Sequence, residues 1–586
     1  MKKILTILLI SIILPITTHA LNPKIVVGGT ELTGSVLEVN GTTGKATYNP
    51  STKTLTLDNY SYTGTGDTIE FSDSYDLKSV ISIIDIEDVT LLVKGTSTIN
   101  LIDESESSYS SAGILTTKGL TIKGENNSIL NINISTPNKT NSAVTATAMY
   151  YNKLLKIENI KFNMDVNNEG DAEALINFNN IIYDEVNKRY TKDNKNDHII
   201  INNCIFDVKL SGSLTYFILS NSLKINDSNI EVETKDNNDN ANSQFTGIYA
   251  ISTIINNSKV RMKSNYELNS MGVDFCFEFK LFNSEFYIDT YKGMNLYNVK
   301  KENFIQQIVE QKGLDNLESV IKVDNSIVEI NSKTEPITCT SYDDAKTIVP
   351  IIVHENYNNY KILVGESKTN INDWDNESLL TNYRYLKIFD LVETNNEIKN
   401  KEDSNISIEN NLEEIIPLTE QEQKLLDYGY EIEARIDMEE TTSVVEEVKN
   451  KILEKVDKKS KIASYINIDL VKVVNGEENT LTELDKNIKV EIKLDDKYIN
   501  KDKNITRTYK MLRYHDDEVD VLNATFDKKT GLLKFETNKF STYALIYADE
   551  EVNTQTGDNL NQYILLALIS SITLIATIIT KRTIEI

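Results

Sequence analysis

A short pattern recurs six times between about residues 155 and 330, and it constrains the fold more than any other feature of the chain. Each copy is an apolar segment, a few polar residues and a second segment in which apolar residues alternate with polar ones, as in 157–162 and 323–328. Successive copies are 44, 24, 30, 26 and 42 residues apart. Self-similarity at such periods is typical of stacked repeats, in which each unit packs on its neighbours.

The third position of every copy is Asn or Asp. These positions are Asn159, Asn203, Asp227, Asn257, Asn283 and Asn325. Because Gly and Pro are rare in the chain, we expect these residues to supply the left-handed backbone conformation of a sharp bend. Coils that stack at ~4.8 Å would align the six side chains in one column, where they hydrogen-bond along the stack and satisfy a buried bend.

Period-two alternation on either side of the bend predicts strands, with an apolar column that fills the interior. This column is Phe162, Phe206, Ile230, Val260, Phe286 and Val328. The short offsets fit one coil each, and the long ones fit either one coil with an insertion or two coils. At ~25 residues per coil, residues 24–345 would make about 12 coils.

The repeat resembles the right-handed parallel β-helix of pectate-lyase-like and polygalacturonase-like proteins, whose bends often carry an asparagine ladder. The Pro-led turn and alternating strand at 46–60, followed by strand-then-Gly segments at 89–96 and 120–124, are similar to carbohydrate-binding-type β-helix modules of Firmicute surface proteins. We therefore predict a mainly β chain with a parallel β-helix and its cap over 21–391. A β-sandwich with frequent Asn turns is the alternative.

Both termini indicate export. Lys2-Lys3, the apolar stretch 4–16 and a small-residue site ending at Ala20 predict a signal peptide over 1–20. At the other end, Asn553-Thr554-Gln555-Thr556-Gly557 precedes an uncharged stretch and Lys581-Arg582, so a transmembrane helix is predicted over 563–580.

This order of parts within 549–586 resembles a Gram-positive cell-wall sorting signal. The motif departs from the common Leu-Pro-x-Thr-Gly form and is closer to Asn-x-Gln-Thr-Gly. The resemblance implies that a sortase cleaves after Thr556 and links it to peptidoglycan, which places the protein outside the cell on the wall. An uncleaved membrane anchor is the alternative.

A polar, Glu- and Asn-rich stretch over 392–415 predicts a flexible linker. Over 416–548 an apolar stripe at 445–456 predicts a helix, and several alternating segments predict strands around a turn at 527–531. Segments 506–510, 514–517 and 540–545 resemble a β-rich domain found before the anchor in clostridial-type surface proteins. That resemblance implies a structural stalk.

Charge and composition narrow the function. The net charge of −27 argues against a nucleic-acid partner. No catalytic constellation stands out, so we predict no enzyme activity and no required cofactor. Calcium is a candidate ligand because Asp193-Asn194 with Asp197, 236–239 and 373–377 are rich in oxygen donors. Trp374, the single Trp, is a candidate platform for sugar stacking, with packing inside the cap as the alternative.

Together these features predict a wall-anchored, non-enzymatic surface protein that binds carbohydrate or a host matrix component. Sortase and peptidoglycan are its expected partners. A polysaccharide lyase or glycosidase of the β-helix class, and a passive surface spacer, are the alternatives.

Overall fold

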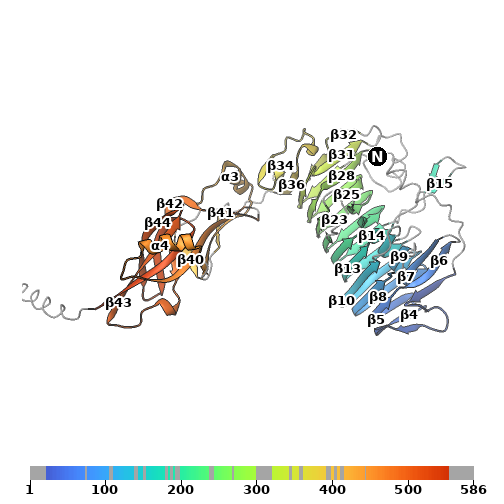
Figure 1. The fold of residues 1–586 in the computed structure, drawn as a ribbon. Coiled ribbons are helices and arrows are strands. Elements are labelled where there is room, and N and C mark those ends of the chain that lie inside the picture. The colour runs from blue at the N-terminus through green and yellow to red at the C-terminus, as the bar shows by residue number, and fades with distance from the viewer. Residues whose placement is uncertain are drawn as a thin grey trace, which may run out of the picture. The chain divides into compact units, whose positions relative to one another are not determined.

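The chain was analysed as a computed structural model and divides into two compact units, Met1–Val392 and Glu393–Ile586. Both are mainly β, and the first unit contains large sheets of parallel strands (Figure 1). The structure describes residues 22–72, 75–104, 110–136, 143–149, 154–177, 182–184, 189–191, 198–235, 243–266, 269–298, 320–341, 346–354, 360–390, 398–401, 405–409, 415–441, 444–474 and 476–552. The expected signal peptide, sorting motif and transmembrane helix lie outside these ranges.

The described residues of the first unit form nine stacked coils, and each coil contributes strands to three faces. The first three coils run through a bend within one long strand. These strands are β5 (Thr54–Gly64), β8 (Val89–Ile102) and β10 (Leu120–Thr136). In the next six coils the bend separates two strands. The pairs are β12 (Leu155–Glu158) and β13 (Lys161–Asn168), β17 (His198–Asn202) and β18 (Ile205–Ser211), β20 (Ser222–Asn226) and β21 (Asn229–Thr234), β23 (Ser252–Asn256) and β24 (Lys259–Lys263), β26 (Glu278–Phe282) and β27 (Glu285–Thr290), and β29 (Val320–Asp324) and β30 (Ile327–Ser332).

The third face is one sheet in which neighbouring coils pair in parallel. Its nine parallel strands are β7 (Tyr75–Ile84), β9 (Ser110–Thr116), β11 (Ala143–Met149), β14 (Asp171–Asn177), β19 (Leu214–Ser220), β22 (Gln244–Tyr249), β25 (Ser270–Cys276), β28 (Lys292–Asn298) and β31 (Ile337–Ser341). This arrangement is compatible with a β-solenoid. Eight steps of ~4.8 Å give a stack about 38 Å high.

The strand register shows how many coils correspond to the long offsets between copies of the repeat. Phe162 pairs with Phe206 and Phe286 pairs with Val328, so offsets of 44 and 42 residues each correspond to one coil. The expected 12 coils were too many, because several coils carry extra residues between their strands and so exceed 25 residues. The apolar interior was predicted well: the column from Phe162 to Val328 is at most 1 % exposed.

Both ends of the stack are covered by antiparallel strands, which pair with backbone groups that would otherwise remain free. At the start these are β1 (Lys24–Val27), β2 (Thr30–Glu31), β3 (Glu38–Asn40), β4 (Thr43–Asn49) and β6 (Asp67–Ser72). At the end they are β32 (Thr347–Ile348), β34 (Tyr360–Ser367), β35 (Asn370–Asp373) and β36 (Tyr385–Asp390). The short β33 (Ile351–His354) pairs in parallel with β29.

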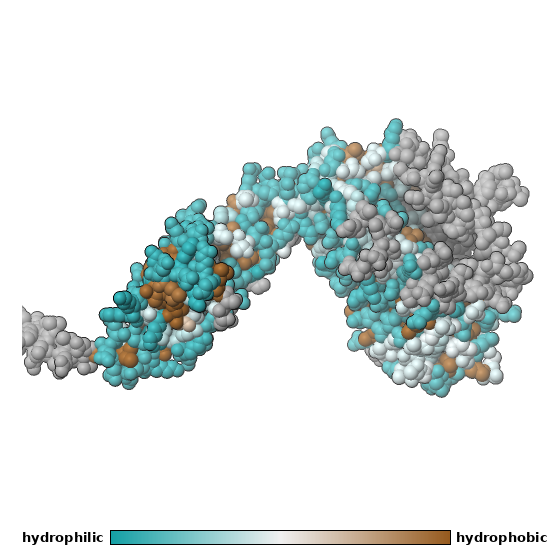
Figure 2. Space-filling view, in the orientation of Figure 1, coloured by the Kyte–Doolittle hydropathy of each residue, from teal (hydrophilic) through white to brown (hydrophobic). Residues whose placement is uncertain are grey.

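In the part that the structure describes, the second unit is a largely antiparallel sheet with two α-helices. Its central strands are β39 (Ile432–Thr441), β40 (Lys461–Val474), β46 (Thr542–Glu551), β43 (Ile505–His515), β44 (Glu518–Asp527), β45 (Leu532–Lys539) and β42 (Glu483–Lys493), with β41 (Glu477–Leu481) beside β40. Helix α3 (Glu420–Asp427) begins at a Thr419 capping box, and α4 (Glu446–Lys455) forms where the apolar stripe predicted a helix. On the face shown in Figure 2, the visible described surface of each unit is mainly hydrophilic.

The segment expected to be a flexible linker contributes two strands to this sheet. β37 (Lys399–Lys401) pairs with β39, and β38 (Ile406–Ile408) pairs with β42. Ile398, Ile406 and Ile408 are buried, at 6, 2 and 7 % exposure. These isoleucines therefore anchor residues 398–401 and 405–409 to the sheet, and in these described parts the stretch is not the flexible linker that was expected over 392–415.

Candidate functional site

The six Asn and Asp residues of the repeat occupy equivalent bends in successive coils. All six have positive φ, between 44° and 53°. Asn and Asp tolerate this left-handed region better than other residues with a side chain. Three earlier coils continue the column with Asn59, Gly95 and Asn127, whose φ values are 49°, 61° and 57°.

The sequence analysis did not identify these three earlier members, because there the chain continues as one strand through the bend. At Gly95 the bend demands glycine, since a Cβ would lie 2.2 Å from Asn59 Oδ1. The backbone N–H of Thr96 donates to the same Asn59 oxygen at 3.2 Å. The Asn-Ser pair at 127–128, which matches later bends, was the available signal.

The column lies on the outside of the coil, which differs from the buried bend that was expected. All six repeat residues are exposed. The buried position is the next residue along the chain. Its members are Ile160, Cys204, Ser228, Ser258, Ser284 and Ser326.

Buried serines satisfy the backbone of the bend. The backbone N–H of Cys204 donates to Ser228 Oγ at 3.0 Å, and that of Ser228 donates to Ser258 Oγ at 3.0 Å. The same bond recurs from Ser258 to Ser284 at 3.1 Å and from Ser284 to Ser326 at 2.9 Å. Each of these serines also donates to the carbonyl two residues before it. The buried backbone of the bend therefore does not need hydrogen bonds from the exposed amide side chains.

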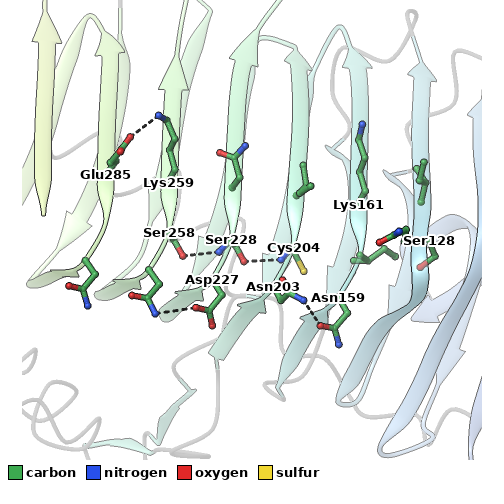
Figure 3. A pocket seen from close by; sticks show the side chains of 17 residues that line it. Ser128, Asn159, Lys161, Asn203, Cys204, Asp227, Ser228, Ser258, Lys259 and Glu285 are labelled. Atoms are coloured by element: carbon green, nitrogen blue, oxygen red, sulfur yellow. Dashed lines mark hydrogen bonds and ion pairs between the residues drawn. The ribbon is translucent and has the colours of Figure 1, made fainter. Parts of the chain in front are cut away.

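The exposed side chains hydrogen-bond to one another in pairs along the column (Figure 3). Asn203 Nδ2 donates to Asn159 Oδ1 at 2.8 Å, and Asn257 Nδ2 donates to Asp227 Oδ1 at 3.1 Å. Asn325 Nδ2 donates to Asn283 Oδ1 at 2.7 Å. An amide has two N–H donors and two lone pairs. One such bond therefore leaves most of the capacity of each side chain for another partner.

An elongated groove of about 850 Å³ runs along this column. It crosses six coils, which at ~4.8 Å per step gives a length of about 24 Å. The lining is 127–129, 159–161, 203–205, 227–229 and 257–259, with Asn283 and Glu285. Figure 3 shows the amide column as one row of the groove and the Ser and Cys positions as the next.

One wall of the groove is formed by the first residue of each strand after the bend. Lys161, Ile205, Asn229, Lys259 and Glu285 lie in direct register there. Lys259 Nζ and Glu285 Oε2 form an ion pair at 2.7 Å. This contact lowers the pKa of the Glu285 carboxyl. Both charges are thereby largely neutralised within the wall.

Trp374 packs inside the C-terminal cap and is only 7 % exposed. Its indole N–H donates to the Ser378 carbonyl and hydroxyl at 3.1 Å each. The ring face is therefore not available to a sugar, and the expected stacking platform is corrected to a packing residue.

The structure offers little support for calcium. In the 373–377 segment, Asp375 Oδ1 accepts from the backbone N–H of Glu377 and Ser378, which makes it a turn residue. Asp193-Asn194, Asp197 and 236–239 lie outside the described residues. Within the described ranges, no group of three or more His, Cys, Asp or Glu side chains is placed to hold a metal ion.

A second polar cluster, not anticipated from the sequence, lies on the sheet of the third face. Thr145 Oγ1 of β11 donates to Glu173 Oε2 of β14 at 2.6 Å, and Glu173 pairs in register with Tyr216 of β19. Burial, with Asp171 nearby, raises the pKa of Glu173 to about 7. The Asp171-Ala172-Glu173 alternation was the only signal, and it does not distinguish a solvated strand face from a shielded one.

The sorting motif Asn553 to Gly557 and the 563–580 segment fall outside the described residues. Among the helices that are described, none has the length and apolar character needed to cross a bilayer. No protein-family model, curated protein or solved structure matches this chain.

Proposed function

We propose that this protein is exported, linked by a sortase to the peptidoglycan of a Gram-positive cell, and binds an extended glycan without cleaving it. The glycan lies in the groove along the exposed amide column of a right-handed parallel β-helix. The β-rich second unit, followed by the sorting signal, serves as the stalk. The export and anchoring parts rest on the two terminal sequence signals.

The observation that supports the binding proposal is the regular row of exposed side chains, five amides and the Asp227 carboxylate, in an elongated groove. One coil step is ~4.8 Å, whereas an extended peptide advances ~3.3 Å per residue. A hexose in an extended chain is close to one coil step in length. Sugar hydroxyls both donate and accept, so each unit can use the remaining capacity of one amide.

A glycan array probed with the full chain, with and without calcium, tests this function. Binding should be weakened in the double variant Asn203→Gly and Asn257→Gly, because glycine keeps the positive-φ bend and removes only the amide. Two lost hydrogen bonds at ~0.5–1.5 kcal/mol each predict an affinity that is weaker by a factor of roughly 5 to 160.

The matched control is Asn133→Ala with Asn331→Ala. These amides bond between coils in the same way, to Asn100 at 2.8 Å and to Asp289 at 3.1 Å, but do not line the groove. Their replacement should leave glycan binding unchanged. Equal loss in both double variants, or a blank array for the parent chain, would refute the groove and favour a passive spacer.

Polysaccharide cleavage is a second candidate because of Glu173. A half-buried carboxyl whose pKa is raised to about 7 has the properties of a general acid. If the chain cleaves glycans, incubation with a polysaccharide panel should release reducing or unsaturated sugars, and Glu173→Gln should abolish the release. No release by the parent chain would exclude this candidate for the panel tested.

A further inference from the structure

The wall of the groove alternates between apolar and polar residues over four successive coils. Ile129 pairs in register with Lys161, Lys161 with Ile205, and Ile205 with Asn229. The Ile205 side chain is 51 % exposed, which is unusual for a large apolar residue. The two isoleucines are two coils apart, or about 9.6 Å along the stack.

The charged side chains of the groove are balanced. The lining includes Lys161, Lys259, Asp227 and Glu285, and so carries two charges of each sign. Lys259 and Glu285 pair with each other, and Asp227 accepts from Asn257. A polyanionic glycan would therefore gain no net attraction from the groove, within a chain that is itself acidic.

The amides, the exposed Ile205 and the half-buried Ile129 together match one substituent, the acetamido group. An acetamido group has one N–H and one carbonyl, which pair with the free carbonyl capacity and N–H of an Asn side chain. It also ends in a methyl group that is poorly solvated. Contact of that methyl with Ile205 would raise the affinity about four-fold, as expected for burial of one such group.

The spacing of the isoleucines fits the geometry of a β-1,4-linked chain. Successive rings in such a chain are turned by half a turn, so a given substituent faces the same side on every second ring. One ring per coil would place acetamido groups on the wall side at every second coil. Ile129 and Ile205 have this separation.

We infer that the ligand is an extended, uncharged β-1,4-linked glycan that carries acetamido groups, with alternate groups seated against Ile129 and Ile205. This inference rests on the proposed glycan-binding function of the groove and names the class of its ligand. Chitin-type chains have all of these properties, and the glycan strands of peptidoglycan share the β-1,4 linkage and the acetamido groups.

Calorimetric titration of the full chain with three hexasaccharides tests the inference. The probes are the β-1,4 hexamers of N-acetylglucosamine, of glucosamine and of glucose. The acetylated hexamer should bind at least ten-fold more tightly than the other two. Ile205→Ser should remove about four-fold of that preference and leave the affinity for the glucose hexamer unchanged.

Ile102→Ser is the matched control, because Ile102 is also exposed, at 42 %, and lies outside the groove. It should leave all three affinities unchanged. A peptidoglycan glycan strand of six sugars forms a further arm, and its affinity relative to the acetylated hexamer identifies the source of the ligand.

Equal affinity for the acetylated and glucose hexamers would overturn the inference while the glycan-binding groove stands. The inference would also fail if Ile205→Ser weakened the binding of both hexamers alike. If no hexamer binds, the inference and the proposed function fall together. Unchanged thermal unfolding of the Ile205 variant confirms that the comparison concerns binding, since an exposed side chain contributes little to the core.

Discussion

At the residue scale, the bend of each coil depends on two adjacent residues with separate tasks. The first, such as Asn257, adopts positive φ and points outward, while the second, such as Ser258, is buried and hydrogen-bonds the backbone of the next coil. The sequence predicted the left-handed bend because Asn recurs there while Gly is scarce. It did not predict which of the two side chains is buried, because both are small and polar.

Glu173 gives a residue-scale prediction on pH. Its folded-state pKa of about 7 is above the ordinary value of 4.5, mainly because of burial, and burial also raises the pKa of Asp171. The folded state therefore binds more protons than the unfolded state between these values. This stabilisation is complete below about pH 4.5 and is lost as the pH rises through about 7.

Glu173→Gln should remove this part of the pH dependence and keep the bond from Thr145, since Gln Oε1 also accepts. The free energy of unfolding at pH 8 should rise by roughly 1–2 kcal/mol relative to the parent, with little change at pH 4.5. Denaturant unfolding across this range measures it. Parallel pH profiles for variant and parent would show that Glu173 is not shielded.

At the element scale, the buried serines should contribute more to the stability of the stacked coils than expected for such small side chains. Ser284→Ala leaves the buried N–H of Ser258 without its acceptor, at a cost of about 1–3 kcal/mol. Ser51→Ala, at an exposed turn, should cost less than about 0.5 kcal/mol. Thermal and urea unfolding compare the two variants, and equal small effects would contradict the assigned role of the serines.

The strands formed by the expected linker give a second prediction at this scale. Ile406 is 2 % exposed in β38, so Ile406→Ala should destabilise the second unit by about 2–4 kcal/mol. Val445→Ala, at a site 70 % exposed, serves as the control. A flexible joint would instead tolerate Ile406→Ala without change.

Elements were predicted unevenly from the sequence, and the reason is physical. Helix α4 and the strands of the repeat show clear periods of 3.6 and 2 residues. β37 and β38 are only three residues long, and their burial depends on partners far along the chain, β39 and β42. The local sequence pattern of a short strand does not identify partners that are distant in the chain.

At the scale of the whole molecule, the terminal signals make a prediction independent of the groove. A sortase that cleaves after Thr556 would leave the protein covalently linked to peptidoglycan. Thr556→Ala should shift it from the wall fraction to the membrane fraction, as shown by fractionation and immunoblotting. Wall linkage of the variant at the parental level would contradict the sorting signal, whatever the groove binds.

The number of coils and the site could only partly be predicted at this scale. Equivalence of Asn159, Asn203 and Asn283 was visible in the repeat, but the residues inserted between strands changed the count from 12 to nine. The groove is lined by residues of six coils, and no local pattern shows that they form one surface. For Trp374 the sequence left both sugar stacking and packing open, and its burial in the cap corresponds to packing.

A crystal structure of the full chain with a bound N-acetylglucosamine hexamer is the most direct measurement. The sugar chain should lie parallel to the stacking direction, with one ring per coil between Asn127 and Asn283 and hydrogen bonds to successive side chains of the column. A hexamer bound across the coils, or away from the groove, would contradict glycan binding by the amide column.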